Sequence, residues 1–100
     1  MSWELTFLPS LSRSLKHADP GQKETVKLAL RALTVYFENN NDLTKARHFA
    51  PRFFFKQLRH PFYEIGVEGK IRIILRREET TFTAILAGNH DEIRRFLANS

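Results

Sequence analysis

The sequence contains no cysteine, and among its 100 residues there are only four glycines, four prolines and one tryptophan. Without cysteine the chain has neither disulfides nor thiolate metal sites, and a small domain of this kind is typical of a reducing compartment. The low glycine and proline content and the 42% apolar residues exclude low-complexity chains and favour a packed globule. This length supports one core, so we expect a single domain over residues 1–100.

Long apolar runs and recognisable cofactor motifs are also missing. No stretch approaches the roughly 18 apolar residues of a membrane span, and "MSWELTFLPSLSRS" lacks the features of a secretory signal, so we expect a soluble, cytoplasmic protein. The chain has no Gly-rich phosphate loop, nucleophile elbow or zinc motif. His17, His48 and His60 are isolated in sequence, without a carboxylate or a second histidine at ligand spacing, and we expect neither a metal nor a cofactor.

Positive charge is in excess. Sixteen Lys and Arg against 11 Asp and Glu give a net charge of +5 and a sequence pI of about 10.0. The excess lies between Lys45 and Arg77, where nine basic residues accompany only two acidic ones, Glu64 and Glu68. Such a balance favours a polyanionic partner or an acidic protein partner.

The N-terminal part of the sequence predicts one strand followed by two helices. Trp3 to Leu8 form a short strand, and Pro9 ends it because proline cannot continue a ladder but can open a helix. The second helix is marked by Asp19 as N-cap, Pro20 at the first helical position and Gln22 in a capping box. Apolar residues follow at helical spacing until "NNND", which favours a turn. We expect these two helices to form an αα-hairpin.

The segment from Leu43 to Pro61 has no clear periodicity and is interpreted as a loop, with a strand-like stretch around its three adjacent phenylalanines. Two strands with alternating apolar residues follow. A two-residue turn between them would place an apolar face beside a basic one. A three-residue turn, residues 68–70, gives one apolar face by pairing Val67 with Ile71, Ile65 with Ile73, and Tyr63 with Leu75.

The C-terminal part predicts a central strand and a helix. "TFTAILAG" is apolar on both faces, as expected of a central strand, and Asn89 with Glu92 three residues on can form a capping box. His90 then falls in the first helical turn. The predicted fold class is α+β, with element order β-α-α-β-β-β-α and a small, mostly antiparallel sheet with the αα-hairpin packed on one face.

This order of elements, the hairpin "FYEIGVEGKIRIILRREE" and the closing "LAGNHDEIRRF" resemble the RelE/ParE superfamily of bacterial toxins from type II toxin–antitoxin modules. The resemblance covers nearly the whole chain and depends on Tyr63, Val67, Gly69 and "RIIL" from Arg72. It implies a RelE-like fold and a cognate acidic antitoxin as partner. RelE-like members cleave mRNA in the ribosomal decoding site, whereas ParE-like members inhibit DNA gyrase without nuclease chemistry.

The resemblance also implies roles for individual residues. Arg72 matches the strand arginine that holds the scissile phosphate in RelE-like nucleases. His90 matches a His or Arg, two residues beyond the late glycine, that acts in acid catalysis or charge stabilisation, and Phe96 lies near a position where some members have Tyr. Gly66 departs from the family, which has a basic or His side chain there, and Glu64 replaces a Lys of RelE. This departure is compatible with a weak nuclease, a rearranged site or a gyrase-type inhibitor.

Cleavage of RNA through the 2′-hydroxyl requires a base, positive charge at the phosphate and an acid for the leaving oxygen. Glu64, Arg72 together with Arg76, and His90 are the candidates for these roles, in that order. Glu64 also fits a cross-strand ion pair with the two arginines, and His90 also fits a helix start without chemistry. Both pairs of interpretations remain open at this point.

The segment "RHFAPRFFFKQLRHPF" interleaves basic and aromatic residues, a combination that suits phosphate contact and base stacking. Three adjacent phenylalanines are more often core residues. We expect phosphate contacts from four basic residues: Arg52, Lys56, Arg59 and Arg76. The predicted function is that of a metal-independent endoribonuclease toxin that acts on ribosome-bound mRNA and has no membrane partner. The alternatives are a ParE-like, non-enzymatic inhibitor of DNA gyrase and an inactive basic binding module.

Overall fold

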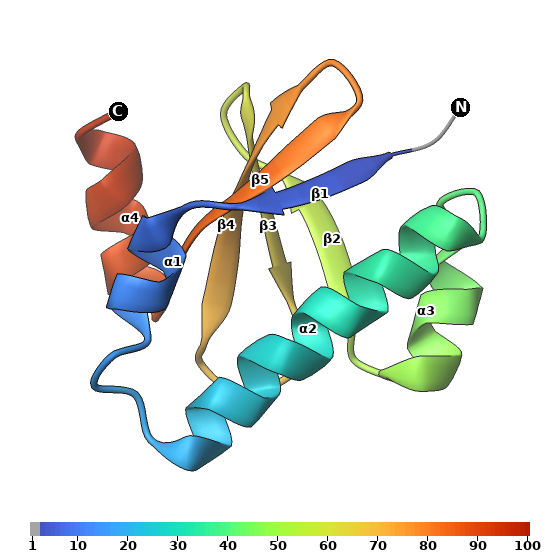
Figure 1. Ribbon diagram of the computed structural model, residues 1–100, viewed down its shortest axis with the longest axis horizontal. Coiled ribbons are helices and arrows are strands. Elements are labelled where there is room, and N and C mark those ends of the chain that lie inside the picture. The colour runs from blue at the N-terminus through green and yellow to red at the C-terminus, as the bar shows by residue number, and fades with distance from the viewer. Residues whose placement is uncertain (1–2) are drawn as a thin grey trace.

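The computed structural model describes residues 3–100 and has the predicted α+β class. Its elements are β1 (Glu4–Phe7), α1 (Pro9–Ser14), α2 (Pro20–Glu38), α3 (Leu43–Phe49), β2 (Phe54–Gln57), β3 (Phe62–Gly66), β4 (Arg72–Glu78), β5 (Thr81–Gly88) and α4 (His90–Ala98). The five strands form one sheet in the order β1-β5-β4-β3-β2 (Figure 1). Only β1 and β5 are parallel, so the sheet is mostly antiparallel. No helix in residues 3–100 has the length and apolar character needed to cross a membrane.

The two longest helices, α2 and α4, begin where the capping patterns predict. The Asp19 carboxylate accepts a hydrogen bond from the Gln22 amide at 2.8 Å, and the Gln22 side chain accepts one from the Asp19 amide at 3.1 Å. Asn89 and Glu92 make the same reciprocal pair at 2.9 and 3.0 Å. Each box satisfies backbone donors that a helix start leaves without an intrahelical partner. Both predicted capping boxes are confirmed.

The interpretation of residues 43–61 as a loop is wrong, because α3 and β2 lie within this segment. The Asp42 side chain begins α3 by accepting a hydrogen bond from the Thr44 amide at 2.8 Å. Ala46 is fully buried, so this short helix is held by packing against the core rather than by its own propensity. The strand-like stretch around the phenylalanines is confirmed as β2. The full order is β-α-α-α-β-β-β-β-α.

The helix pairing also requires a correction. α2 packs against α3, whereas α1 packs on β5. Two serines fix α1 to that strand: the Ser10 hydroxyl donates to the Ile85 carbonyl at 2.5 Å, and the Ser14 hydroxyl oxygen accepts from the Ala87 amide at 3.0 Å. These bonds tie α1 to the sheet, so the pair of neighbouring helices in this fold is α2 with α3 rather than α1 with α2.

The register of the central hairpin agrees with the three-residue turn. Ile65 is opposite Ile73, and Tyr63 is opposite Leu75. The ladder stops there, so the third predicted pair lies outside it in the turn. Gly69 occupies this turn with a φ of +67°, a left-handed conformation that glycine adopts without a steric penalty.

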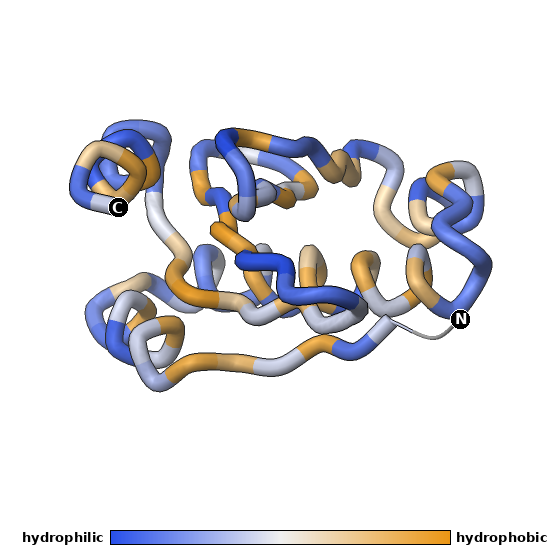
Figure 2. The backbone as a smooth tube through the Cα atoms, turned by 90° about the horizontal axis from the view of Figure 1, so that it is seen from above, coloured by the Kyte–Doolittle hydropathy of each residue, from blue (hydrophilic) through white to orange (hydrophobic). Residues whose placement is uncertain are grey.

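Two separate cores cover the two faces of the sheet. Ile73 belongs to the larger core, which contacts α1, α2 and α3, whereas its neighbour Ile74 belongs to a smaller core under α4. Successive residues of a strand point to opposite faces, so α2 and α4 lie on opposite sides of the sheet (Figure 2). The buried members of the smaller core are Ile74, Ile85 and Ile93.

The three adjacent phenylalanines have three different environments. Phe53 is completely buried in the larger core. Phe55 packs between aromatic rings on the α2 side, with ring centroids 5.0 Å from Tyr36 and 5.3 Å from Tyr63, and burial raises the pKa of Tyr36. Phe54 lies beside an arginine instead. Phe53 and Phe55 are therefore core residues, as the sequence predicts, whereas Phe54 is not.

We expect Phe53→Ala to lower the free energy of unfolding by about 3–5 kcal/mol, because it removes a large, fully buried side chain and leaves a cavity. Phe49→Leu is the control: Phe49 is 41% exposed, and its substitution should cost less than about 1 kcal/mol. Urea unfolding monitored by circular dichroism measures both. Equal losses for the two variants would contradict the assignment of Phe53 to the core.

Candidate nucleic-acid interface

Four neighbouring strands bring Phe54, Gly66, Arg72 and Gly88 into one line across the sheet, here called the Arg72 row. Phe54 is opposite Gly66, and Arg72 is opposite Gly88. Gly66 and Arg72 are also neighbours, since a Cβ atom on Gly66 would lie 3.0 Å from the Arg72 Cδ. Residues directly opposite each other point to the same face. Arg72 therefore has a glycine on either side of it.

The Arg72 side chain is held at one edge and free at the other. Its Cζ atom lies 5.0 Å from the centroid of the Phe54 ring, within the range of a cation–π contact. Its Nη1 donates to the carbonyls of Gly69 and Ile71 at 2.8 and 3.1 Å. Nε and Nη2 make no hydrogen bond with any of residues 3–100. Arginine binds phosphate through two coplanar N–H groups, and this pair is available for it.

His90 is the first residue of α4. It comes two residues after Gly88, which is the last residue of β5 and a member of the Arg72 row. The side chain is exposed and makes no hydrogen bond or ion pair within residues 3–100. The capping box of Asn89 and Glu92 fixes the backbone on which it stands. Arg72 begins β4 and lies opposite Gly88 at the end of β5, so Arg72 and the start of α4 at His90 lie at the same end of the sheet.

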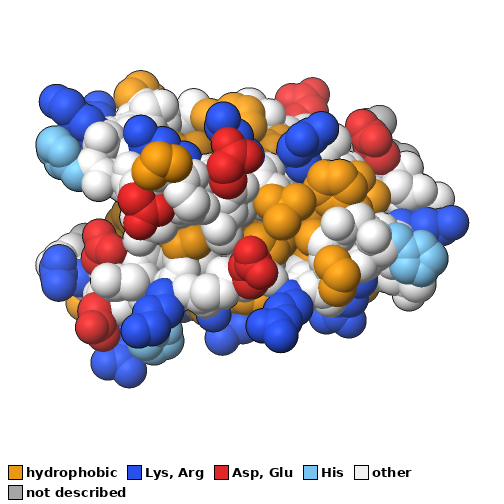
Figure 3. All heavy atoms as spheres, turned by 90° about the horizontal axis from the view of Figure 1, so that it is seen from below, with side chains coloured by type: hydrophobic (Ala, Val, Ile, Leu, Met, Phe, Trp, Pro, Cys, Tyr) orange, Lys and Arg blue, Asp and Glu red, His pale blue; other side chains and the backbone are white. Residues whose placement is uncertain are grey.

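A cleft of about 750 Å³ opens at this end of the sheet, seen as a notch at the left of Figure 3. It lies between the start of α2, the turn from β3 to β4 and the start of α4. Arg52 and Lys70 contribute positive charge to its lining, and Asp19, Glu68 and Glu92 contribute negative charge. Of the predicted site residues, Arg52 lines this cleft, whereas Arg72 and His90 lie outside its lining.

Glu64 has a different cationic partner from the expected one. The register places Arg72 and Arg76 diagonally across from it, as predicted. Its carboxylate nevertheless pairs with Lys56 on β2 at 3.7 Å, while Arg76 pairs with Glu78 at 3.5 Å. The Glu64 side chain is only 7% exposed. A buried, paired carboxylate is poorly placed to meet a substrate hydroxyl.

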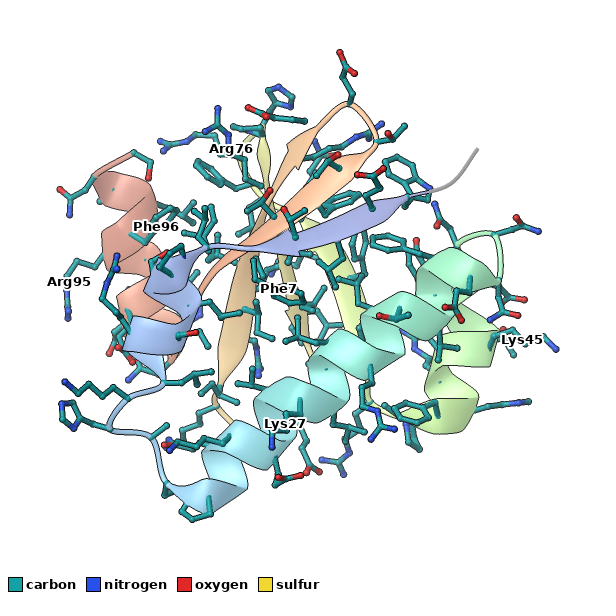
Figure 4. All side chains as sticks on the ribbon, in the orientation of Figure 1. Phe7, Lys27, Lys45, Arg76, Arg95 and Phe96 are labelled. Carbon is teal, nitrogen blue, oxygen red and sulfur yellow. The ribbon has the colours of Figure 1, made fainter. Side chains whose placement is uncertain are left out.

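Arg59 and Arg76 lie away from His90. The Arg59 Nη2 donates to the carbonyls of Leu97 and Ser100 at 2.6 and 3.1 Å, so this side chain caps the end of α4. Arg76 lies at the top of the sheet in Figure 4. The nine residues of α4 span about 13 Å from His90 to that end. Arg52 therefore lies toward the start of α4, whereas Arg59 lies at its opposite end.

Phe96 belongs to the apolar contact between α4 and the sheet. Its ring packs edge-on against Phe62, with centroids 5.3 Å apart and an interplanar angle of 84°. Figure 4 shows Phe96 on the sheet side of α4 and Arg95 pointing away from it. Phe96 thus packs against the smaller core, at the opposite end of α4 from the Arg72 row.

The comparisons with known proteins divide sharply between sequence and structure. Protein-family models and curated proteins give no match to the sequence. Solved structures match over most of both chains. YafQ from E. coli strain BL21(DE3) is 14% identical with a TM-score of 0.56, and the match covers 92% of this chain and 98% of YafQ. The chain has the fold of YafQ.

Chains of two toxin–antitoxin complexes match this chain to a similar extent. A chain of the RelB–RelE complex from Methanococcus jannaschii is 18% identical with a TM-score of 0.62, covering 91% of this chain and 96% of the other. A chain of the E. coli DinJ–YafQ complex is 12% identical with a TM-score of 0.64, covering 93% and 98%. These matches confirm the predicted RelE-like fold. At such low identity the likeness concerns the fold alone.

We expect Arg59→Ala to loosen the end of α4, because it removes both hydrogen bonds to the terminal carbonyls. The loss in stability should be about 1 kcal/mol, with faster amide hydrogen exchange in residues 93–98. Arg76→Ala is the matched control, since its exposed ion pair with Glu78 contributes little. Unchanged exchange in the Arg59 variant would show that its contact with α4 carries no stability.

Proposed function

We propose that the protein is the toxin of a type II toxin–antitoxin module and cleaves ribosome-bound mRNA in the cytoplasm without a metal ion. The observation that carries this proposal is the free Nε and Nη2 edge of Arg72 at the same end of the sheet as His90, in a YafQ-like fold. Within residues 3–100 no group of three or more His, Asp and Glu side chains could hold a metal ion. The proposal assigns the chemistry to side chains.

In this proposal the free edge of Arg72 holds two non-bridging oxygens of the scissile phosphate and balances the negative charge that develops there. The 2′-oxygen attacks phosphorus, the bond to the 5′-oxygen breaks, and His90 in its protonated form donates a proton to that leaving oxygen. The products are a 2′,3′-cyclic phosphate and a 5′-hydroxyl. The proton of the attacking hydroxyl passes to water, because Glu64 is buried against Lys56.

The proposed partner is an acidic antitoxin that covers the basic surface. The net charge of +5 favours it, and two of the matched structures are described as antitoxin–toxin complexes. Opposite charges accelerate association, and added salt screens them. Binding to such an antitoxin should therefore become slower as the salt concentration rises.

Induced expression without an antitoxin should arrest growth, with translation failing before DNA supercoiling changes. Amino-acid incorporation and plasmid supercoiling followed in one time course separate the nuclease from a ParE-like gyrase inhibitor. Early loss of supercoiling with intact mRNA would refute the proposed nuclease. Absence of any arrest would favour an inactive binding module.

Arg72→Ala and His90→Ala should each lower cleavage of ribosome-bound mRNA roughly 10²-fold or more, because one removes the phosphate contact and the other the acid. His90→Gln should not restore activity, since glutamine cannot donate a proton to the leaving oxygen. Arg94→Ala, an exposed change within α4, is the control and should retain activity. If His90→Ala cleaves as fast as the parent at an unchanged melting temperature, His90 is only a helix-start residue.

Glu64→Gln separates a general base from an ion-pair residue. We expect cleavage to stay within about twofold of the parent, because the buried carboxylate does not meet the substrate. Loss of the pair with Lys56, whose side chain is 61% exposed, should cost at most about 1 kcal/mol of stability. A 10²-fold loss of cleavage with little loss of stability would instead make Glu64 the base.

A further inference from the structure

The Phe54 ring, the missing side chain of Gly66 and the Arg72 guanidinium form one stacked unit. We propose that Phe54 and Gly66 are positioning residues that hold the free edge of Arg72 toward a phosphate of the RNA. This inference rests on the proposed nuclease function and deepens it. Phe54 and Gly66 have no polar side-chain group, so they would act only through the position of Arg72.

The space above Gly66 is already filled by this unit. A Cβ atom there would lie 2.7 Å from Cε1 and 3.0 Å from Cζ of the Phe54 ring, and 3.0 Å from Cδ of Arg72. Carbon atoms without a bond between them attract each other best at about 3.5–4.0 Å, so these distances are repulsive. Any larger residue at this position would push the ring or the arginine aside. Glycine is therefore a steric requirement of the stack.

The stack restricts an otherwise mobile side chain. Arginine has many rotamers, and a bidentate contact with phosphate requires two of its N–H groups to be aligned at once. The Arg72 Cζ lies over the Phe54 ring, 5.0 Å from its centroid, and the turn carbonyls of Gly69 and Ile71 accept hydrogen bonds from Nη1. Because one edge of the Arg72 guanidinium is hydrogen-bonded and one of its faces is covered by the ring, its Nε and Nη2 groups keep a fixed direction. Pre-organised groups of this kind stabilise a transition state without reorganising during the reaction.

The same geometry explains why a glycine stands at position 66, where the RelE/ParE superfamily that the sequence resembles has a basic or His side chain. A basic or His side chain at that position would collide with Phe54 and Arg72. The chain therefore concentrates the positive charge of the Arg72 row on one well-held arginine. Gly66 serves this arrangement, so the missing side chain does not imply a missing activity.

A second arginine–phenylalanine pair provides a control. The Arg31 Cζ lies 5.8 Å from the centroid of the Phe49 ring. This pair joins α2 to α3, the Phe49 side chain is 41% exposed, and Arg31 makes no side-chain hydrogen bond within residues 3–100. Phe49→Leu thus removes a similar contact at a place with no proposed role in cleavage.

The first experiment measures cleavage of ribosome-bound mRNA by variants of the stack. Phe54→Leu and Gly66→Ala should each lower kcat/KM about tenfold, Phe54→Tyr should restore activity by retaining a ring, and Phe49→Leu should have no effect. In an Arg72→Ala background, Phe54→Leu should cause no further loss, because its effect passes through Arg72. A full additional tenfold loss in that background, or parental activity of Phe54→Leu alone, would overturn the proposal.

The second experiment is independent of nuclease activity. The Nε–H signal of Arg72 is followed by NMR during titration with inorganic phosphate, with Arg72→Ala used to assign it. The parent signal should shift on phosphate addition, and Phe54→Leu should weaken that response at least fivefold. Parental protein that responds to phosphate without cleaving mRNA would refute the proposed function and leave the positioning role intact. No response in the parent, or an equal response in Phe54→Leu, would refute the positioning role.

Discussion

The structure depends on one constraint, which is that the middle strands are apolar on both faces. Ile73 and Ile74 are consecutive and fully or almost fully buried, so each face of β4 requires its own cover. The larger core under α2 and α3 satisfies one face. On the other face α4 begins at His90, beside the Arg72 end of the sheet, and its nine residues cover the apolar part of β4 and β5. The start of α4 and the start of β4 therefore lie together at the candidate site.

Much of the fold follows from local patterns in the sequence. Both capping boxes, the register of the β3–β4 hairpin and the interior place of β5 depend on short-range chemistry or on matching apolar faces. α3 was missed because the segment mixes basic, aromatic and small residues, although Asp42 followed by Leu43, Ala46 and Ala50 carries a cap and a helical spacing. The packing of α1 on β5 and the parallel β1–β5 pair join distant parts of the chain, which no local pattern specifies.

The candidate site was predictable where the register determines it. The hairpin register and the late Gly88 place Arg72 and His90 at one end of the sheet. The role of Phe54 was hidden, because it requires β2 to be recognised and paired so that the ring falls opposite Gly66. Arg59 and Lys56 have the positive charge expected of phosphate ligands. Arg59 nevertheless contacts carbonyls of α4, and Lys56 contacts Glu64. Sequence spacing does not say which partner a long basic side chain meets.

In the proposed function, the end of the sheet at Arg72 promotes attack by an RNA 2′-hydroxyl on the adjacent phosphate. The most direct test is to replace the nucleotide on the 5′ side of the scissile bond in a ribosome-bound mRNA by its 2′-deoxy form. Cleavage at that bond should stop, while the unmodified mRNA should give a fragment ending in a 2′,3′-cyclic phosphate. Undiminished cleavage of the deoxy-substituted mRNA at the same bond would contradict it.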